Sequence, residues 1–178
     1  MRAAILRDDS GTLNIEDVTI DKPDRNEVLI KTVASGLCHS DLHFIDGSWS
    51  FLAMYPMLLG HEAAGVVQAV GEDVVGIQTG DHVITCLSMF CGYCERCLTG
   101  HSYLCSERQQ VQGRQPGNQP RITDNDGAEV NQFTGIGSFG EEMLVHQNGV
   151  VKISNEMPLD RAALVGCGVT TGVGAVFR

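Results

Sequence analysis

Four of the chain's seven cysteines lie within fifteen residues, in the segment MFCGYCERCLTGHSYLC (89–105). They are Cys91, Cys94, Cys97 and Cys105. Thiolates separated by two residues can turn back onto one ion, and four of them form the tetrahedral cage of a structural zinc site. Gly92 and Gly100 ease the turns between them. Four protein ligands leave no position for water or substrate, so we expect this lobe, about residues 89–106, to be structural.

Two disulfides are the alternative interpretation of the cysteine cluster. The N-terminal segment 1–15 carries charge where a signal peptide needs an apolar core, and no apolar run reaches the roughly 18–20 residues that cross a bilayer. We therefore expect a cytoplasmic protein that does not enter the membrane. In that reducing compartment metal binding is favoured over disulfides.

The charge of the chain narrows the class of partner. The net charge is −10, and twelve lysines and arginines are scattered along 178 residues without a basic cluster. Surfaces that bind nucleic acid or anionic membranes gather basic residues, so we expect small-molecule partners and no nucleic acid. The length suits one domain with a core, or a core and the start of a second domain.

Short β-type segments bounded by turn residues recur along the chain. They cover residues 3–7, 13–20, 27–36, 65–71, 81–87, 141–147 and 149–154. Regular helices do not alternate with them, so the pattern predicts an antiparallel barrel or sandwich rather than a parallel sheet. The expected fold class is mainly β with short helices (α+β).

Two helical segments and one long loop complete this prediction. A short helical turn is expected over Ser40–Ile45, opened by a polar capping residue, and a helix rich in small residues is expected to begin near Asp160. Residues 106–134 are polar and rich in Gly and Pro. We interpret that segment as a long, partly disordered surface loop.

A second set of ligands is possible among the remaining cysteines and histidines. Catalytic zinc usually takes three protein ligands and keeps one position open. Cys38 in GLCHSDLH, His61 in LLGHEAAG and Cys167 in VGCGVTTG are the candidates. Ligands far apart in sequence are not identified by spacing, and a single buried cysteine is more often a core residue. On these residues alone both interpretations stay open.

Five motifs together resemble one known family, the zinc-dependent medium-chain alcohol dehydrogenases. They are GLCHSDLH (36–43), YPMLLGHEAAGVV (55–67), GDHV (80–83), the cysteine lobe and GCGVTTG (166–172), in the same order and at similar spacing. The resemblance spans nearly the whole chain. It implies a GroES-like β-barrel catalytic domain over residues 1–160 and two zinc ions per chain. The catalytic ion would bind Cys38, His61 and Cys167, and the structural ion would bind the lobe.

The resemblance also implies a proton path beside the catalytic zinc. Zinc there is a Lewis acid that lowers the pKa of an alcohol, from which hydride passes to a nicotinamide. Ser40 would accept the alcohol proton and His43 would pass it to solvent. Without the resemblance, Ser40 is a helix cap and His43 a surface histidine.

Four further residues match family positions. Asp41 resembles the carboxylate that fixes the tautomer of the zinc-binding histidine, and Glu62 resembles a residue near the metal that assists ligand exchange. His39 matches a contact to the coenzyme pyrophosphate, and Thr171 matches a residue beside the nicotinamide ring. Each is otherwise an ordinary polar residue.

The coenzyme-binding Rossmann domain is expected to be absent from this chain. GIGSFG (135–140) satisfies G-x-G-x-x-G by letter, but strand-like residues 141–146 follow where a helix is needed. Residues 161–178 are expected to form a helix leading towards a missing domain. We therefore expect the catalytic portion of a longer enzyme, inactive alone, whose parent binds NAD(P) and is a homo-oligomer.

The implied reaction of the parent is oxidation of primary alcohols, aromatic ones included, to aldehydes. An apolar segment, Trp49–Tyr55, is placed either to wall a substrate cleft or to fill the barrel core. Two alternatives remain. One is a portion of a thiol-adduct formaldehyde dehydrogenase, weakened by Trp49 where those relatives place an acidic residue. The other is a non-catalytic GroES-like zinc module that binds a partner.

Overall fold

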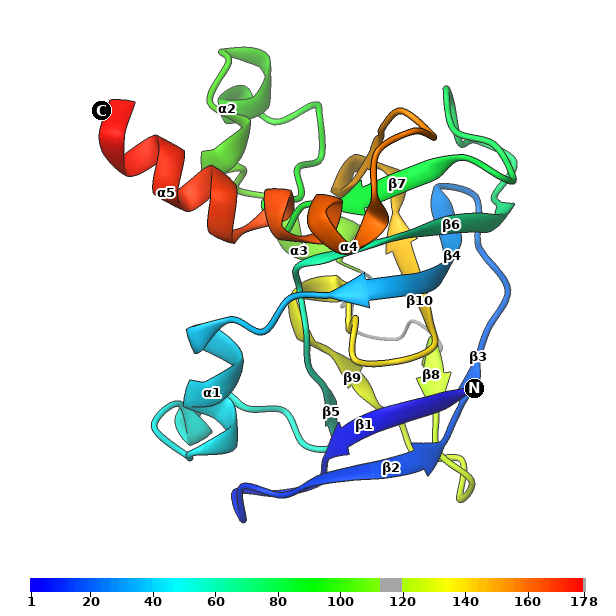
Figure 1. Cartoon of the computed structure of the whole chain (residues 1–178), viewed down its shortest axis with the longest axis vertical. Helices are drawn as coiled ribbons and strands as arrows, with labels where there is room; N and C mark the ends of the chain where they lie inside the picture. The colour runs from blue at the N-terminus through cyan, green and yellow to red at the C-terminus, as the bar shows by residue number, and fades with distance from the viewer. Residues whose placement is uncertain (113–119, 178) are drawn as a thin grey trace.

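The computed structural model describes residues 1–112 and 120–177 of the chain (Figure 1). The strands are β1 (Arg2–Leu6), β2 (Leu13–Asp17), β3 (Thr19–Ile20), β4 (Glu27–Ser35), β5 (Met57–Leu58), β6 (Ala63–Val70), β7 (His82–Thr85), β8 (Ile122–Thr123), β9 (Asn131–Gln132), β10 (Glu142–His146) and β11 (Val150–Lys152). The α-helices are α1 (His39–Ile45), α2 (Glu95–Leu98), α3 (Arg108–Val111), α4 (Leu159–Ala162) and α5 (Gly168–Phe177). The 3-10 turns are η1 (Ser50–Leu52), η2 (Ser102–Leu104), η3 (Phe133–Gly135), η4 (Gln147–Gly149) and η5 (Ala163–Gly166).

The strands form two main sheets and a two-stranded ribbon. The larger sheet has the order β10-β4-β6-β7-β11, the smaller one β2-β1-β5-β9, and β3 pairs with β8. Among the described residues every pairing is antiparallel except that of β5 with β9. All seven strand segments expected from the sequence are confirmed, as is the mainly β fold class with short helices.

Strand β4 illustrates why these segments are strands. Buried and more exposed side chains alternate along its first half. Val28 and Ile30 are fully buried, whereas Lys31, the next residue, is exposed to solvent. This period of two places apolar residues on one face of the sheet. They join the main core with buried residues of β6, β7 and β10, among them Val67, Val83 and Met143.

The C-terminal segment packs on the larger sheet and then leaves it. Ala162 and Ala163 are buried against Ala64 and Ile84 of β6 and β7. The expected single helix from Asp160 is instead interrupted, because Cys167 has φ −137° and ψ −70° between η5 and α5. Helix α5 has no buried residue and extends away from the sheets (Figure 1).

The interpretation of residues 106–134 as a surface loop is wrong for much of that segment. It contains α3, β8, β9 and the start of η3. Ile122 and Val130 are 1% and 2% exposed and join a core cluster with Ile5 and Leu58. These two apolar side chains anchor the segment in the core, although the average composition of residues 106–134 is polar. Residues 113–119 of this expectation lie outside the described residues.

Two further features bear on the sequence predictions. The GIGSFG segment precedes strand β10 rather than a helix, so it lacks the strand–turn–helix setting of a dinucleotide site. None of the helices in residues 1–112 and 120–177 is long and apolar enough to cross a membrane.

Candidate metal centres

The four lobe cysteines converge on one point. All four sulfur atoms lie within 4.8 Å of one another. The Sγ–Sγ distances are 3.5 Å for Cys94–Cys97, 3.8 Å for Cys91–Cys97 and 3.9 Å for Cys94–Cys105. An S–S bond is about 2.05 Å long, so these are free thiols and not disulfides. Four sulfurs at about 2.3 Å from a tetrahedral zinc would be about 3.8 Å apart, so the donor set and its spacing fit zinc.

Local backbone geometry holds the lobe together. The backbone N–H of Cys91 donates to Cys105 Sγ at 3.3 Å, and that of Cys94 donates to Cys91 Sγ at 3.3 Å. Gly92 and Gly100 have φ of +85° and +81°, a conformation that L side chains rarely adopt. The expected role of these two glycines in the turns is therefore confirmed.

The lobe thiols differ in acidity because they share so small a space. Backbone N–H groups of Cys97 and Ser106 lower the pKa of Cys94 to about 5. Burial, together with the neighbouring sulfurs, raises the pKa of Cys97 to about 12. Negative charge is thus stabilised on one sulfur and opposed on another, as expected of neighbouring thiols that interact with one another.

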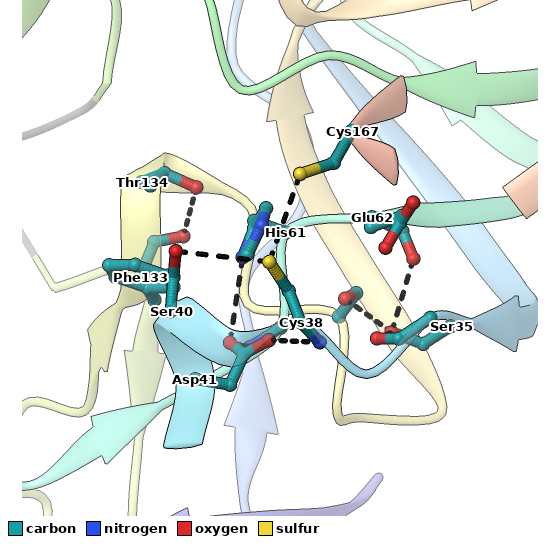
Figure 2. Close-up of polar contacts among 12 residues, drawn as sticks. Ser35, Cys38, Ser40, Asp41, His61, Glu62, Phe133, Thr134 and Cys167 are labelled. Atoms are coloured by element: carbon teal, nitrogen blue, oxygen red, sulfur yellow. Dashed lines mark hydrogen bonds and ion pairs between the residues drawn. The ribbon is translucent and has the colours of Figure 1, made fainter. Parts of the chain in front are cut away.

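Cys38, His61 and Cys167 form a second cluster, drawn in Figure 2. Their ligand atoms also lie within 4.8 Å of one another, and the Sγ atoms of Cys38 and Cys167 are 3.9 Å apart. Cys38 precedes α1, His61 lies between β5 and β6, and Cys167 lies between η5 and α5. Three separate segments of the fold therefore meet here, and the donor set of two thiols and one imidazole suits zinc.

Asp41 joins two of these three segments. It is 2% exposed, and its carboxylate accepts hydrogen bonds from the backbone N–H of Cys38 at 3.1 Å and of Gly60 at 3.0 Å. Asp41 Oδ1 also lies 3.5 Å from Nδ1 of His61. One buried side chain in α1 thus fixes the backbone next to both Cys38 and His61.

The His61 ring is buried with an incompletely satisfied nitrogen. It is 2% exposed, and its Nδ1 makes no hydrogen bond in the described residues, although Asp41 Oδ1 lies 3.5 Å away. The Phe133 ring meets it edge-on with centroids 5.3 Å apart. Burial acts to lower the pKa of His61, but Asp41 and Cys38 outweigh it, so the pKa is raised.

The two thiols of this cluster are shifted in opposite directions. Burial, and then the neighbouring Cys38 sulfur, raises the pKa of Cys167 to about 11. Burial also acts to raise the pKa of Cys38, but hydrogen bonds from Ser40 and Cys167 outweigh it and the net shift is downward. As in the lobe, one sulfur is the preferred site of negative charge.

The expected proton-path residues lie on α1. The Ser40 hydroxyl is 3.8 Å from Cys38 Sγ. The His43 ring stacks on His39 and meets Trp49 at a tilt, with centroids 4.5 and 4.6 Å away, and its Nδ1 is buried without a hydrogen bond in the described residues. Within that part of the chain no hydrogen bond joins Ser40 to His43, although both residues lie on α1.

The remaining predicted residues lie at different depths. Glu62 is 4% exposed and its Oε1 accepts the backbone N–H of Gly168 at 2.7 Å. His39 and Thr171 are exposed. The backbone N–H of Thr171 donates to the Cys167 carbonyl at 2.8 Å, so Thr171 lies one turn beyond that ligand.

The apolar segment Trp49–Tyr55 divides between the two expected roles. Trp49 and Tyr55 pack against a core cluster that contains Phe44 and Met57, whereas Phe51 and Leu52 are exposed. Phe133 was not anticipated beside His61, because it lies in the segment interpreted as a loop. A single aromatic residue in a polar segment gives no signal of such a contact.

Comparison with known proteins agrees with this architecture. A family model described as the alcohol dehydrogenase GroES-like domain matches residues 24–155. The chain therefore belongs to this family. Its relatives are zinc-dependent medium-chain alcohol dehydrogenases, and the resemblance drawn from the sequence motifs is confirmed.

Two relatives illustrate the similarity in sequence. S-(hydroxymethyl)glutathione dehydrogenase of Saccharomyces cerevisiae is 38% identical over 178 residues, which cover 99% of this chain and 46% of that protein. NDMA-dependent alcohol dehydrogenase of Amycolatopsis methanolica is 40% identical over 172 residues, 96% of this chain and 46% of that protein. The chain spans about half the length of the curated relatives it matches.

Solved structures are similar as well. An alcohol dehydrogenase zinc-binding domain protein from Burkholderia ambifaria matches with a TM-score of 0.90 and 36% identity, over 99% of this chain and 48% of that one. Benzyl alcohol dehydrogenase from Acinetobacter calcoaceticus matches with a TM-score of 0.82 and 32% identity, over 99% and 47%. The GroES-like fold expected from the sequence is thereby confirmed.

Proposed function

We propose that this chain supplies the zinc-binding catalytic domain of an alcohol dehydrogenase that oxidises primary alcohols, aromatic ones included, to aldehydes with transfer of hydride to NAD(P). The observation that carries the proposal is the cluster of Cys38, His61 and Cys167, three converging ligands with a donor set that suits a zinc ion with one open position. The four-ligand lobe is proposed to hold a second, structural zinc.

Zinc bound by the three ligands would supply Lewis acidity. Asp41 holds the backbone at Cys38 and at Gly60 and orients the His61 ring so that Nδ1 faces the carboxylate. The other ring nitrogen, Nε2, is then the one available to a metal. Residues of this chain that do not bind the metal therefore hold two of its proposed ligands in place.

Proton transfer is assigned to residues of α1. The Ser40 hydroxyl, beside Cys38, would accept the proton of the substrate alcohol and release its own proton towards solvent. His43, whose Nδ1 is buried without a partner in the described residues, would pass that proton onward. The stack of His39, His43 and Trp49 holds the imidazole in place.

Contacts with the coenzyme are proposed for His39 and Thr171. Both are exposed, and Thr171 lies one turn after Cys167, where a nicotinamide could approach the site. The proposed catalytic domain covers residues 1–160, and residues 161–178 lead towards the coenzyme-binding part. We further propose that the full-length protein is a cytoplasmic homo-oligomer.

A second candidate function is oxidation of a thiol adduct of formaldehyde. Two relatives at 38% and 39% identity are named S-(hydroxymethyl)glutathione dehydrogenase, which favours this reaction. Trp49 weakens this candidate, because its apolar ring, which packs on His43 and Phe44, lies near the position where the resemblance places an acidic side chain for the adduct.

The experiment that tests both candidates measures aldehyde formation and nicotinamide reduction by the full-length protein. Benzyl alcohol, ethanol and S-(hydroxymethyl)glutathione are compared as substrates. We expect benzyl alcohol to be oxidised fastest, with at least a 1,000-fold loss in Cys167→Ser, on the order of what loss of metal catalysis costs, and little change in Cys86→Ser. A higher rate with the glutathione adduct would select the second candidate. Zinc binding without oxidation of any of the three would favour a non-catalytic zinc module.

A further inference from the structure

Cys167 lies where the chain leaves the body of the domain. Before it, Ala162 and Ala163 are buried against the larger sheet. After it, α5 contains no buried residue. Cys167 itself adopts a non-helical conformation between η5 and α5. The position of its sulfur therefore depends on the few contacts that hold the peptide groups on either side.

Glu62 makes one of those contacts. Its Oε1 accepts the backbone N–H of Gly168, the residue after Cys167, at 2.7 Å. Glu62 directly follows His61 in sequence, and its own carbonyl accepts the backbone N–H of Gly36 at 2.6 Å. One residue thus connects the segments that carry Cys38, His61 and Cys167.

The carboxylate of Glu62 fills a slot between two glycines. A Cβ at Gly36 would lie 2.6 Å from Oε2 and 2.8 Å from Cδ of Glu62, which is closer than real Cβ contacts allow. A Cβ at Gly168 would lie 3.1 Å from Oε1. The absence of a Cβ at both positions therefore leaves the space that the carboxylate occupies beside the Gly168 N–H.

Among the described residues, no cationic side chain balances this buried group. In residues 1–112 and 120–177, Glu62 forms no ion pair with lysine or arginine. The hydrogen-bond donor it faces is the first N–H of the ten-residue helix α5. The buried carboxylate therefore holds the start of α5 beside Glu62.

We propose that Glu62 is a positioning residue: through the hydrogen bond to Gly168 it holds Cys167 within ligand distance of Cys38 and His61. The inference rests on the proposed metal site and adds to it the reason why a ligand from the edge of the domain stays in place. It assigns the effect to the hydrogen-bond acceptor and the shape of the side chain, not to its charge.

The test measures binding of Co²⁺ to the purified chain after metal removal, using the near-ultraviolet thiolate-to-cobalt absorption and a competing chelator. Two reference variants separate the signals of the two sites. Cys97→Ser removes a ligand of the lobe, and Cys167→Ser removes a ligand of the three-ligand site. We expect Glu62→Ala to weaken Co²⁺ binding at the three-ligand site by about 10- to 100-fold and to reduce its thiolate absorption, with the lobe unchanged. Glu62→Gln, which keeps an oxygen acceptor for Gly168, should stay within about twofold of the unsubstituted chain.

Gly36→Ala gives a second perturbation that leaves Glu62 in the sequence. Its Cβ displaces the carboxylate, so we expect at least a fivefold weakening at the same site. Gly172→Ala in α5 is the matched control, because nothing lies within 4 Å of its Cβ, and it should bind Co²⁺ as the unsubstituted chain does.

Three outcomes would overturn the inference. Unchanged Co²⁺ binding in Glu62→Ala would show that the hydrogen bond does not position Cys167. A loss in Glu62→Gln equal to that in Glu62→Ala would assign the effect to charge. If Glu62→Ala fails to fold, as judged by circular dichroism and loss of lobe cobalt, unchanged binding in Gly36→Ala decides against the inference. Failure of the unsubstituted chain to bind cobalt at Cys38, His61 and Cys167 would instead remove the proposed function itself.

Discussion

The four lobe cysteines come from fifteen consecutive residues, whereas Cys38 and Cys167 of the other cluster are 129 residues apart. The lobe is shaped by its own backbone, through N–H···S hydrogen bonds and two glycines with positive φ. The three-ligand cluster is shaped by the barrel, through Asp41 and Glu62. The same thiol chemistry is therefore supported by local structure in one region and by tertiary structure in the other.

This difference has a functional consequence. A lobe with four ligands encloses its ion completely and needs only its own short segment. A three-ligand site leaves room for a substrate oxygen, and the ligands must then be held by residues that do not touch the metal. We expect the lobe to tolerate changes in the barrel, and the three-ligand site to respond to them.

The largest expected effect is loss of the lobe ion. Cys97→Ser removes the sulfur that lies 3.5 Å from Cys94 and 3.8 Å from Cys91. We expect zinc content to fall by one ion per chain and amide hydrogen exchange to increase across residues 89–106, because metal binding and folding of such a lobe are coupled. The three-ligand site should keep its ion.

Cys86→Ser is the control for this change, since Cys86 is a half-buried thiol outside both clusters. Loss of both ions in Cys97→Ser would mean that the two regions fold as one unit, and the contrast between them would be lost.

A smaller effect on zinc binding is expected when Asp41, which supports the three-ligand site, is replaced. Asp41→Ala leaves the backbone N–H groups of Cys38 and Gly60 without their acceptor and His61 without its neighbouring carboxylate. We expect about 10- to 100-fold weaker zinc binding at the three-ligand site, measured by chelator competition, with the lobe ion retained. Asp46→Ala, at the exposed end of α1, should have no effect. An equal loss of zinc affinity in Asp41→Ala and Asp46→Ala would show that the effect comes from destabilising α1 and not from losing the contacts of Asp41.

Backbone strain in the lobe should give a still smaller effect. Gly92 has φ +85° with open space around its Cβ position, so Gly92→Ala introduces conformational strain without a clash. A cost of about 1 kcal/mol corresponds to about fivefold weaker zinc binding in the lobe. Gly76→Ala carries the same strain at φ +79° outside both clusters and should leave zinc affinity unchanged. Unchanged affinity in Gly92→Ala would argue that the lobe is not shaped by its own turns.

The smallest effect is expected from a charge pair of the barrel remote from both clusters. Lys152 Nζ lies 2.8 Å from the buried Asp81 and lowers the pKa of that carboxyl below its ordinary value of 3.8. A lowered pKa in the folded state stabilises the protein above the ordinary pKa, and the contribution is lost as pH falls through the folded value.

Lys152→Met should therefore decrease the free energy of unfolding slightly at pH 7 and less as the pH falls below about 3.8, with zinc content unchanged. Urea unfolding at several pH values measures this. A pH-independent difference would argue that packing, and not charge, accounts for the change.

The lobe and most strands could be predicted from the sequence because their signals are local. Cys91 to Cys105 identify a zinc cage by interval, and the alternation of Val28 and Ile30 identifies β4. The grouping of Cys38, His61 and Cys167 came from family motifs, because no local pattern connects residues on three segments.

The contacts that were not predicted depend on packing between distant segments. Phe133 beside His61 and the bond from Gly168 to Glu62 join residues more than seventy positions apart. The burial of Ile122 and Val130 reflects two apolar side chains in a polar segment. Average composition describes such a segment poorly, since burial is decided by individual residues.

The central claim is that one ion is enclosed and the other is accessible. Elemental analysis of gently purified, never chelated protein, followed during exposure to a chelator, tests it directly. We predict two zinc ions per chain, one removed rapidly and one retained. A single inert ion, two ions lost at the same rate, or no transition metal at all would contradict the account.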